Sequence, residues 1–554
     1  MLVLFALVLF SAYWVKQDHF VYFWDYSNYW CISIERMEYM FNHSFEDILK
    51  SLLFSINNDD YNNLLPTILA LPLKMVGDSF ARYAFLNVLI FLIPSILVQG
   101  LIAVKVVDNF ERKSMVYILA LIIAALMPAN YYATFRGYID VAFLLPTSIA
   151  LYLFVDFDFR QIIISKNVAI SLMLVLGWLC RRYVIFFIIG YVLALTVKAI
   201  IIIIEDRGLK NLGKIFLNFF IIGGTSIGIL LLFFRQFFLH ALLTDYGNMY
   251  SAYDAPFSIK IQTLETTFGI VSLVIILMVG VLCIINKSNC VNYFSLLIML
   301  ITECFVFWRT QSMSIQHRMI LNVPIFIIFA VGLNFWKHKK TNSYFKNCVN
   351  KIICIFCATL MVLNFCKAFI PLISVSNTGT FYSERYYPLF RNDMNALNEI
   401  VDKLNDLTDG TEDKIYVLAS GTTLNSDVLR KFYMPYSNNA VINMCNTHDV
   451  DLRDGFPEDF LHARYVVTTD PVQLHLPSGQ EVVSYLANNV NDADSYIGCH
   501  YKRMWKTELD NNVTVYLFEK ESDYTEEDLQ QISKYYSNLY PGYDSIFAEK
   551  IKLN

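Results

Sequence analysis

Charge is scarce in this chain. Only 16% of its 554 residues are Asp, Glu, Lys or Arg, whereas 56% are hydrophobic. The formal net charge is −5, and the basic residues are scattered between hydrophobic blocks. Binding along a nucleic acid requires a concentrated basic face. The composition therefore excludes nucleic acid as a partner.

Familiar nucleotide and zinc motifs are also missing. The chain has no Gly-rich phosphate loop and no HExxH pair, which argues against ATP-driven transport and zinc proteolysis. Most of the eleven cysteines fall within apolar blocks, and we interpret them as small buried hydrophobic residues. Cys445 and Cys499 lie in a polar tail and are candidates for one disulfide if that tail faces an oxidising compartment.

Long apolar blocks dominate what is present. Each has about the length needed to cross a hydrocarbon core of roughly 30 Å, so the chain is predicted to be a polytopic α-helical membrane protein. About eleven spans are expected, near residues 1–15, 83–105, 114–128, 141–155, 167–180, 183–204, 215–240, 267–286, 291–307, 319–335 and 352–373. With the N-terminus inside, the predicted inner loops carry most of the Lys and Arg residues, as the positive-inside rule requires.

An odd number of spans places two large polar regions on the outer side. One is a first outer loop, about residues 16–82, whose apolar segment Leu64–Val76 is too short to span and is predicted to lie at the interface. The other begins at about residue 374, where the composition becomes polar and acidic. Strand-like runs at 414–420, 463–469 and 513–518 and a helical pattern near 391–408 predict a soluble α/β domain over 374–554, after a transmembrane module over 1–373.

The first outer loop carries a carboxylate, Asp25, within the aromatic run Phe20–Trp30. Trp and Tyr favour the level of the lipid headgroups, so Asp25 is expected at the bilayer surface. A partly desolvated carboxylate there could act as a general base towards an acceptor hydroxyl. The alternative is that Asp25 only caps or solvates a helix terminus.

Several predicted outer helix ends carry basic residues against the positive-inside trend. A guanidinium group binds phosphate oxygens through a planar fork, so a ring of such residues would suit a phosphate or pyrophosphate lipid. Anchoring to ordinary headgroups, or pairing with acids of the loop, is the alternative. The candidates for donor-phosphate binding are Arg136, which is followed by Asp140, and Arg181, Arg182, Arg309, His317 and Arg318.

The order of these features resembles the C-type membrane glycosyltransferases (GT-C), in particular the group similar to protein O-mannosyltransferases and lipid A aminoarabinose transferases. The resemblance covers a first span, a long outer loop with an acid just after that span, an interfacial helix, about ten further spans and an outer C-terminal domain. The local sequence Asp59-Asp60-Tyr61-Asn-Asn-Leu-Leu-Pro66, followed by Pro72, Gly77-Asp78-Ser79 and Ala81-Arg82, is similar to the segment before the second span in such enzymes.

The resemblance implies transfer of a sugar from a polyprenyl-phosphate carrier to a glycan, lipid or protein acceptor, by a single displacement that inverts the anomeric carbon. Asp25 matches the acid of the first loop that serves as base or orients the acceptor, and the arginines would hold the donor phosphate. Asp25 is followed by Tyr26, without the Asp-Glu pair of the mannosyltransferases. The second acid and any divalent metal therefore stay open, with Asp60 and Asp140 as candidates.

Other functions fit parts of this pattern. A transporter or flippase of lipid-linked oligosaccharide would also need arginines among its helices, but it is expected to have short loops and internal repeats. A cell-envelope polymerase or ligase would differ mainly in its acceptor. A membrane-anchored binding protein would need only one helix. The composition indicates a bacterial plasma membrane, with the C-terminal domain extracytoplasmic.

Overall fold

The computed structural model describes residues 2–107, 112–336, 344–370, 381–433 and 440–552. The chain divides into two compact units. The first unit comprises residues 1–17, 28–244 and 255–388, and the second comprises 18–27, 245–254 and 389–554. The predicted domain limit between residues 373 and 374 lies outside the described residues.

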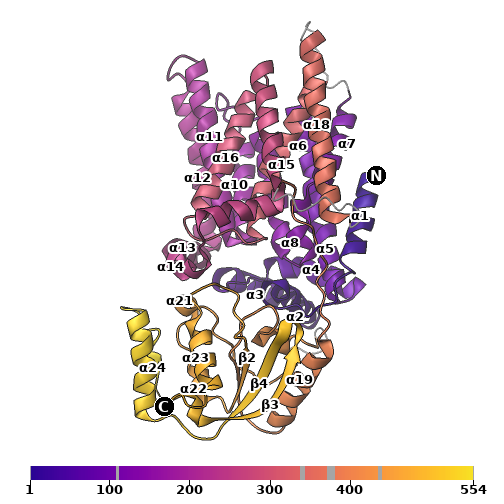
Figure 1. Cartoon of the computed structure of the whole chain (residues 1–554). Helices are drawn as coiled ribbons and strands as arrows, with labels where there is room; N and C mark the ends of the chain where they lie inside the picture. Colours follow the sequence, from indigo (N-terminus) through magenta and orange to yellow (C-terminus); the bar gives the residue numbers. More distant parts are fainter. Residues whose placement is uncertain (1, 108–111, 337–343, 371–380, 434–439, 553–554) are drawn as a thin grey trace. The chain divides into compact units, whose positions relative to one another are not determined.

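The first unit is built from apolar helices (Figure 1). Within the part of the chain that the structure describes, seven helical segments are long and apolar enough to cross a membrane, and a bent pair, Lys113–Ala125 with Pro128–Phe135, would make an eighth. The seven are Phe80–Val106, Arg182–Glu205, Leu212–Phe233, Phe257–Asn286, Cys290–Phe307, His317–Phe335 and Asn347–Phe369. Helices of this length and composition show that the chain is a multi-pass membrane protein.

The other predicted spans fall on shorter or bent helices. The span expected near 114–128 is the first arm of the bent pair, which turns by 71°. Those expected near 1–15, 141–155 and 167–180 correspond to Leu2–Trp14, Ile139–Phe154 and Ile164–Cys180, and Leu64–Val76 is also a short apolar helix. The multi-pass helical class is thus confirmed, while the count of eleven spans stays a prediction.

Most helices of the first unit coincide with the apolar blocks of the sequence, whereas α2 and α3 come from the polar first loop. Their bounds are α1 Leu2–Trp14, α2 Asn28–Asn42, α3 Phe45–Asn58, α4 Leu64–Val76, α5 Phe80–Asn87, α6 Ile93–Val106, α7 Lys113–Ala125, α8 Tyr132–Phe135, α9 Leu144–Phe154, α10 Ile164–Cys180, α11 Ile185–Glu205, α12 Leu212–Phe233, α13 Arg235–Leu243, α15 Phe257–Asn286, α16 Cys290–Phe307, α17 Asn322–Gly332 and α18 Tyr344–Phe369.

The predicted outer loop folds into three helices, α2, α3 and α4, held together by one buried arginine. Arg36 on α2 is 4% exposed and donates to Thr67 Oγ1 at 3.0 Å, Ser51 Oγ at 2.9 Å and the Ile48 carbonyl at 2.8 Å. Because a buried guanidinium must satisfy its donors, these three bonds fix the helices of the loop to each other.

Helix α15 is interrupted at Gly269, where the segment after α18 crosses it closely. Gly269 has φ 69° and ψ 151°, a conformation adopted essentially by glycine alone. The freed backbone groups are used: Val271 N–H donates to the Phe381 carbonyl at 2.9 Å, and Ser383 Oγ donates to the Thr267 carbonyl at 2.9 Å. The break in α15 therefore allows the segment after α18 to hydrogen-bond with the α15 backbone.

Gly269→Ala should destabilise the first unit by about 2 kcal/mol, because L residues are strained at this φ. The added Cβ would also lie 2.7 Å from Ser383 N and 2.8 Å from Tyr382 C, both backbone atoms. Thermal unfolding of the purified protein measures the loss. Gly228→Ala on α12 is the matched control, since nothing lies within 4 Å of its added Cβ; equal stability of both variants would contradict the close crossing.

The second unit contains a four-stranded sheet of order β1-β2-β4-β3. β1 (Ile415–Val417) pairs in parallel with β2 (Tyr465–Asp470), with Tyr416 opposite Val466. β4 (Val513–Lys520) pairs antiparallel with β2 and with β3 (Tyr501–Leu509). The C-terminal region is therefore a small sheet domain, as predicted.

Helices cover both faces of this sheet (Figure 1). α19 and α20 share a hydrophobic cluster with Val467 and Leu517, whereas α22, α23 and α24 share another with Val466 and Phe518. Adjacent strand residues point to opposite faces, which separates the two clusters. The bounds are α14 Tyr246–Met249, α19 Met394–Thr408, α20 Ser426–Arg430, α21 Asp451–Asp454, α22 Glu458–His462, α23 Glu481–Asn491 and α24 Glu526–Leu539.

Part of the aromatic run around Asp25 belongs to the hydrophobic core of this domain. Val21 is 4% exposed and Phe23 is 1% exposed, and both belong to the hydrophobic cluster beneath α19. His19 N–H donates to the Leu389 carbonyl at 2.8 Å, and Arg391 N–H donates to the His19 carbonyl at 2.9 Å. The aromatic residues that the sequence suggested for a membrane interface thus include some that pack inside the sheet domain.

The cysteine prediction is not fulfilled. Cys445 is buried and Cys499 is exposed, and both thiols are free. Cys445 belongs to the hydrophobic cluster of α22, α23 and α24. The pair therefore forms no disulfide, and Cys445 instead fills space in the core like other buried free cysteines.

Candidate functional site

A buried ion pair lies where α9 and α10 approach each other in the first unit. Asp140, in the 3₁₀ turn Ile139–Phe143, is 1% exposed, and its Oδ1 lies 2.8 Å from Arg181 Nε. Arg181 stands in extended conformation between the end of α10 and the 3₁₀ turn Arg182–Val184 that precedes α11. The break between these helices turns the Arg181 side chain towards the acid.

Two tyrosines and a histidine complete this cluster. Tyr183 O–H donates to Asp140 Oδ1 at 2.5 Å, and Arg181 Nη1 donates to Tyr29 Oη at 2.8 Å. The His317 ring centroid lies 4.6 Å from that of Tyr183, and His317 is close enough to Arg181 and Arg318 for both charges to act on it. The structure thus brings together three predicted site residues, Asp140, Arg181 and His317.

A second ion pair sits beside the first because its arginine is the next residue. Arg182 Nη1 donates to Asp60 Oδ1 at 2.5 Å, and Arg182 Nη2 donates to the Asp59 carbonyl at 3.3 Å. His240 Nε2 lies 3.9 Å from the same Asp60 oxygen. The Asp60 side chain is 66% exposed, so this pair is open to solvent whereas the Asp140 pair is not.

The remaining predicted arginines have separate partners. Arg136 donates to the Tyr387 carbonyl, and its guanidinium carbon lies 4.5 Å from the Tyr386 ring centroid. Arg318 Nη1 donates to Thr267 Oγ1 at 2.6 Å and its Nε donates to the Met313 carbonyl at 3.0 Å. Arg309 is exposed. Arg136 and Arg318 are thus engaged by backbone and hydroxyl oxygens, while Arg181 and Arg182 pair with carboxylates.

Asp25 belongs to the second unit. It lies in the 3₁₀ turn Trp24–Tyr26, and Trp24 N–H donates to Asp427 Oδ2 at 2.8 Å. Trp24 has φ 46°, a value rare for a bulky residue. Asp427 is on α20, so the sheet domain holds the turn that presents Asp25.

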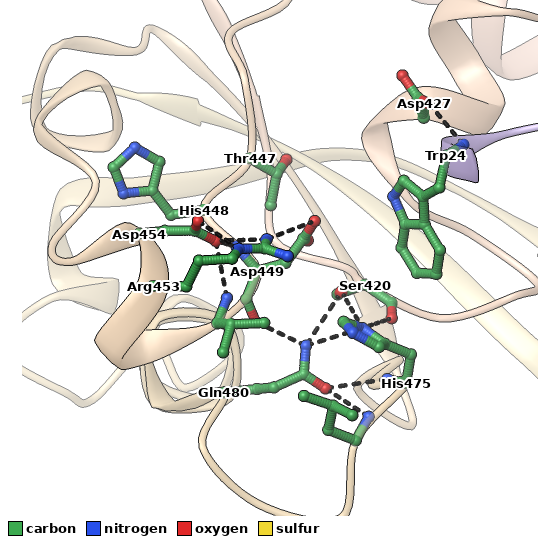
Figure 2. Close-up of polar contacts among 12 residues, drawn as sticks. Trp24, Ser420, Asp427, Thr447, His448, Asp449, Arg453, Asp454, His475 and Gln480 are labelled. Carbon is green, nitrogen blue, oxygen red and sulfur yellow. Dashed lines mark hydrogen bonds and ion pairs between the residues drawn. The ribbon is translucent and has the colours of Figure 1, made fainter. Parts of the chain in front are cut away.

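A polar cluster in the same unit was not predicted. It lies at the carboxyl ends of β1 and β2, where His475 Nδ1 is 2.8 Å from Ser420 Oγ (Figure 2). His475 Nε2 is 3.3 Å from Tyr253 Oη. Arg453 Nη1 donates to Tyr253 Oη at 3.1 Å, and the Trp24 ring centroid lies 4.8 Å from that of His475. We call Tyr253, Ser420, Asp449, Arg453, His475 and Gln480 the β-end cluster.

Burial shifts the pKa values of two groups in the β-end cluster. Burial raises the pKa of the Asp449 carboxyl to about 7, although a hydrogen bond with Ser420 and the charge of Arg453 act to lower it. Burial also lowers the pKa of His475, so its ring is neutral at pH 7. Perturbed acids and bases of this kind concentrate at functional sites.

One sequence signal could have found this cluster. Ser420 ends the strand-like run 414–420, and His475 follows the run 463–469 by six residues. Parallel strands end at one edge of a sheet, where ligands and active sites of α/β folds gather. Tyr253 could not be found this way, because its loop is distant in sequence from both strands.

Two short motif matches fall inside apolar helices, where the surrounding structure differs from that of the enzymes in which these motifs act. Gly224 to Gly228 has the pattern G-x-S-x-G, but Ser226 lies within α12 and donates to the Ile222 carbonyl at 2.9 Å. Cys354 and Cys357 have the spacing C-x-x-C on α18, and both thiols are free. Neither forms a nucleophile elbow or a redox pair.

Within the described residues, no group of three or more His, Cys, Asp or Glu side chains is placed to hold a metal ion. Two carboxylates of the first unit that the sequence suggested as candidates, Asp140 and Asp60, are instead paired with Arg181 and Arg182. The donor set among the described residues of either unit therefore does not fit a divalent metal site.

Comparisons of the sequence with known proteins find no match, and comparison of the structure finds a distant similarity. No protein-family model matches the chain, and no curated protein does. Among solved structures, the chain is similar to the Archaeoglobus fulgidus oligosaccharyltransferase, solved in complex with Zn and sulfate, with 12% sequence identity and a TM-score of 0.40 over 92% of this chain and 72% of that chain.

Proposed function

We propose that the protein is a C-type membrane glycosyltransferase that moves a sugar from a polyprenyl-phosphate carrier to an acceptor hydroxyl or amine. The proposed setting is the outer face of a bacterial plasma membrane, with about eleven spans and the sheet domain outside. The support is the order of the sequence features together with the charged groups that the two units carry.

The observation that carries the proposal is the group formed by Asp60, Asp140, Arg181 and Arg182 at the junction of α10 and α11. Buried charge is costly in a protein of apolar helices and is retained mainly where it serves function. Arg182 is partly exposed and bonded to an acid that is itself exposed. A phosphate could replace that carboxylate, because a guanidinium binds both through the same planar fork.

In the proposed reaction, the acceptor oxygen or nitrogen forms a bond to the anomeric carbon as the bond from that carbon to the phosphate oxygen breaks. The proton of the acceptor passes to a carboxylate, the role that the sequence predicts for Asp25. Polyprenyl phosphate leaves with the bonding electron pair, and arginines such as Arg182 stabilise its added negative charge. One displacement from the opposite face inverts the anomeric configuration.

The test is release of polyprenyl phosphate by the purified protein in lipid nanodiscs, using a panel of polyprenyl-phosphate hexoses and aminopentoses. Turnover of at least one donor, with the sugar recovered on an added acceptor, is expected. Arg182→Gln should raise KM for that donor about tenfold, since a charged hydrogen bond is worth about 1.5 to 3 kcal/mol. Lys502→Gln, an exposed residue of the sheet domain, is the control.

Two outcomes would contradict the proposed function or the proposed role of Arg182. If wild-type protein releases no polyprenyl phosphate from any donor but moves the same lipids across proteoliposome membranes, transport replaces transfer as the function. If Arg182→Gln turns over with unchanged KM, the pair with Asp60 has no part in donor binding.

A further inference from the structure

A polar cavity lies in the first unit where α9 ends and α10 and α12 begin. Its volume is about 100 Å³, and its lining includes Asp156, Asp158, Ile163, Lys166, Asn167 and Asn218. The first three lie between α9 and α10, the next two in the first turn of α10, and Asn218 on α12. One water needs about 10 to 15 Å³ in this measure, so a small polar group has room. We call it the asparagine cavity.

The asparagine cavity lies close to the level of the lipid headgroups. α12 has 22 residues and is apolar enough to cross a membrane; its length of about 33 Å is close to that of the hydrocarbon core. Its ends therefore lie near the headgroups, and Asn218 is in the second turn from one end. Ile164 and Phe216, beside the lining residues in sequence, are 62% and 72% exposed, as apolar side chains that contact lipid are.

Hydrogen bonding fixes the orientation of both asparagine amides. Asn218 Nδ2 donates to the Gln161 carbonyl at 3.0 Å and to the Lys214 carbonyl at 2.9 Å. Because a carbonyl can only accept, the Asn218 amide cannot be reversed, and its Oδ1 accepts from Asn167 Nδ2 at 2.7 Å. The Asn167 amide is therefore oriented as well, with its nitrogen on Asn218.

This arrangement leaves Asn167 Oδ1 as an acceptor without a donor. Asn167 is fully buried, and no described residue donates to its Oδ1. A buried acceptor without a partner is costly, and the large majority of such atoms in proteins are paired. A donor held in the cavity that Asn167 lines would satisfy it.

Asp158 has capacity for the same donor. Its Oδ1 accepts from the Arg160 backbone N–H at 3.0 Å and lies 3.7 Å from Arg160 Nη1. The Arg160 guanidinium is bonded instead to Glu205 and Asp206, at 2.8 and 3.0 Å. A carboxylate offers about four lone-pair sites, so Asp158, whose side chain is 40% exposed, can accept a further hydrogen bond.

Two lysines stand beside these acceptors. Asp156, which also lines the cavity, accepts from Lys166 Nζ at 2.7 Å and from Lys105 Nζ at 2.9 Å. An anion alone would meet the carboxylates of Asp156 and Asp158, and a cation alone would meet the lysines. The lining therefore suits a zwitterion whose cationic end can donate hydrogen bonds.

We propose that the asparagine cavity binds the ammonium end of a phosphoethanolamine group. A primary ammonium has three hydrogens to donate and no acceptor, so it bonds to Asn167 Oδ1 and to the Asp158 carboxylate at once. Lys105 and Lys166 supply positive charge for the neighbouring phosphate. An ethanolamine phospholipid and soluble phosphoethanolamine share this chemistry. The inference does not depend on the proposed glycosyl transfer.

Native mass spectrometry of the purified protein measures lipid binding directly. The probes are phosphatidylethanolamine, phosphatidylcholine and phosphatidylglycerol with the same acyl chains. Phosphatidylethanolamine should bind about tenfold more tightly than the other two, because choline has no N–H to donate and glycerol carries no positive charge. Equal binding of the three lipids would overturn the proposal, since a cavity that holds only water gives no such preference.

Two variants locate the preference in the cavity. Asp158→Asn keeps an acceptor for the Arg160 N–H and removes the charge, so Kd for phosphatidylethanolamine should rise about 10-fold while phosphatidylcholine binding stays the same. Asn167→Leu removes the buried acceptor and should act likewise, with gel filtration and thermal unfolding as checks of folding. Glu46→Gln, an exposed acid of α3, is the control. If Asp158→Asn keeps the wild-type preference, the proposal is wrong, whether or not Asn167→Leu folds.

A competition experiment distinguishes the two sources of the group. Displacement of phosphatidylethanolamine by soluble phosphoethanolamine, and not by phosphocholine, would show that the headgroup alone suffices and that a soluble ligand can serve. Binding of the lipid without displacement would identify the phospholipid as the ligand. Because these measurements involve no sugar donor, a failure of glycosyl transfer would leave their result unchanged.

Discussion

Replacement of Asp25 by asparagine should lower kcat by about 10²- to 10⁴-fold, the range that general-base catalysis supplies. The substitution keeps the size of the side chain and its ability to accept hydrogen bonds, but it cannot take a proton. The turn around it should survive, because its anchors are the bond from Trp24 N–H to Asp427 at 2.8 Å and the buried Phe23 ring. The loss should therefore fall on kcat and spare KM for the donor.

Steady-state turnover of the polyprenyl-phosphate sugar in nanodiscs measures this effect. Asp494→Asn is the matched control, since Asp494 is an exposed acid of the same unit and should keep full activity. Gel filtration and thermal unfolding must show that Asp25→Asn remains folded. A folded variant that keeps at least a third of wild-type kcat would mean that Asp25 serves only to solvate the turn.

Much of the helical architecture could be predicted, because a membrane imposes length and apolarity on each span. The bounds of Leu64–Val76 agree with α4, and three runs in the tail agree with β1, β2 and β4. β3 was missed because it is an edge strand: Lys502, Arg503 and Met504 are all exposed, so alternation of apolar and polar residues is lost. Exposed edge strands commonly carry such charge.

The site was harder to predict, because ion pairing depends on distances that sequence does not contain. The sequence suggested Arg181, Arg182 and Arg318 as one group of phosphate ligands. In the structure Arg181 lies against Asp140, Arg182 against Asp60, and Arg318 against Thr267. The sequence identifies the charged residues near the helix ends. Helix breaks such as that between Cys180 and Arg182 decide where each of their side chains points.

The placement of Asp25 illustrates a further limit. Its aromatic neighbours are typical of a membrane interface, yet Val21 and Phe23 pack within the sheet domain. A short apolar segment fits either environment equally well, and only the partner that covers it decides between them. The same holds for the loop at 245–254, which joins the second unit although its flanking helices belong to the first.

Arg181→Met should strongly destabilise the first unit. It would leave the Asp140 carboxylate, 1% exposed, without its ion-pair partner. Breaking a buried pair from one side costs about 3 to 5 kcal/mol, because an uncompensated charge stays in the interior. Thermal unfolding in detergent measures the effect. Lys502→Met is the control, because its pair with Glu521 is exposed and its loss should change stability little.

The double variant Asp140→Leu with Arg181→Met separates structure from function. Replacing both charged partners with apolar side chains of similar size is often neutral or stabilising, so most of the lost stability should return. Tyr183 keeps the Gln316 carbonyl at 3.2 Å as an acceptor, so its buried hydroxyl does not lose all its partners. If the pair serves glycosyl transfer, this folded double variant stays inactive. Recovery of wild-type turnover together with stability would show that the buried pair only holds α2, α9 and α10 together, and would leave Arg182 and Asp60 as the donor-binding group of the first unit.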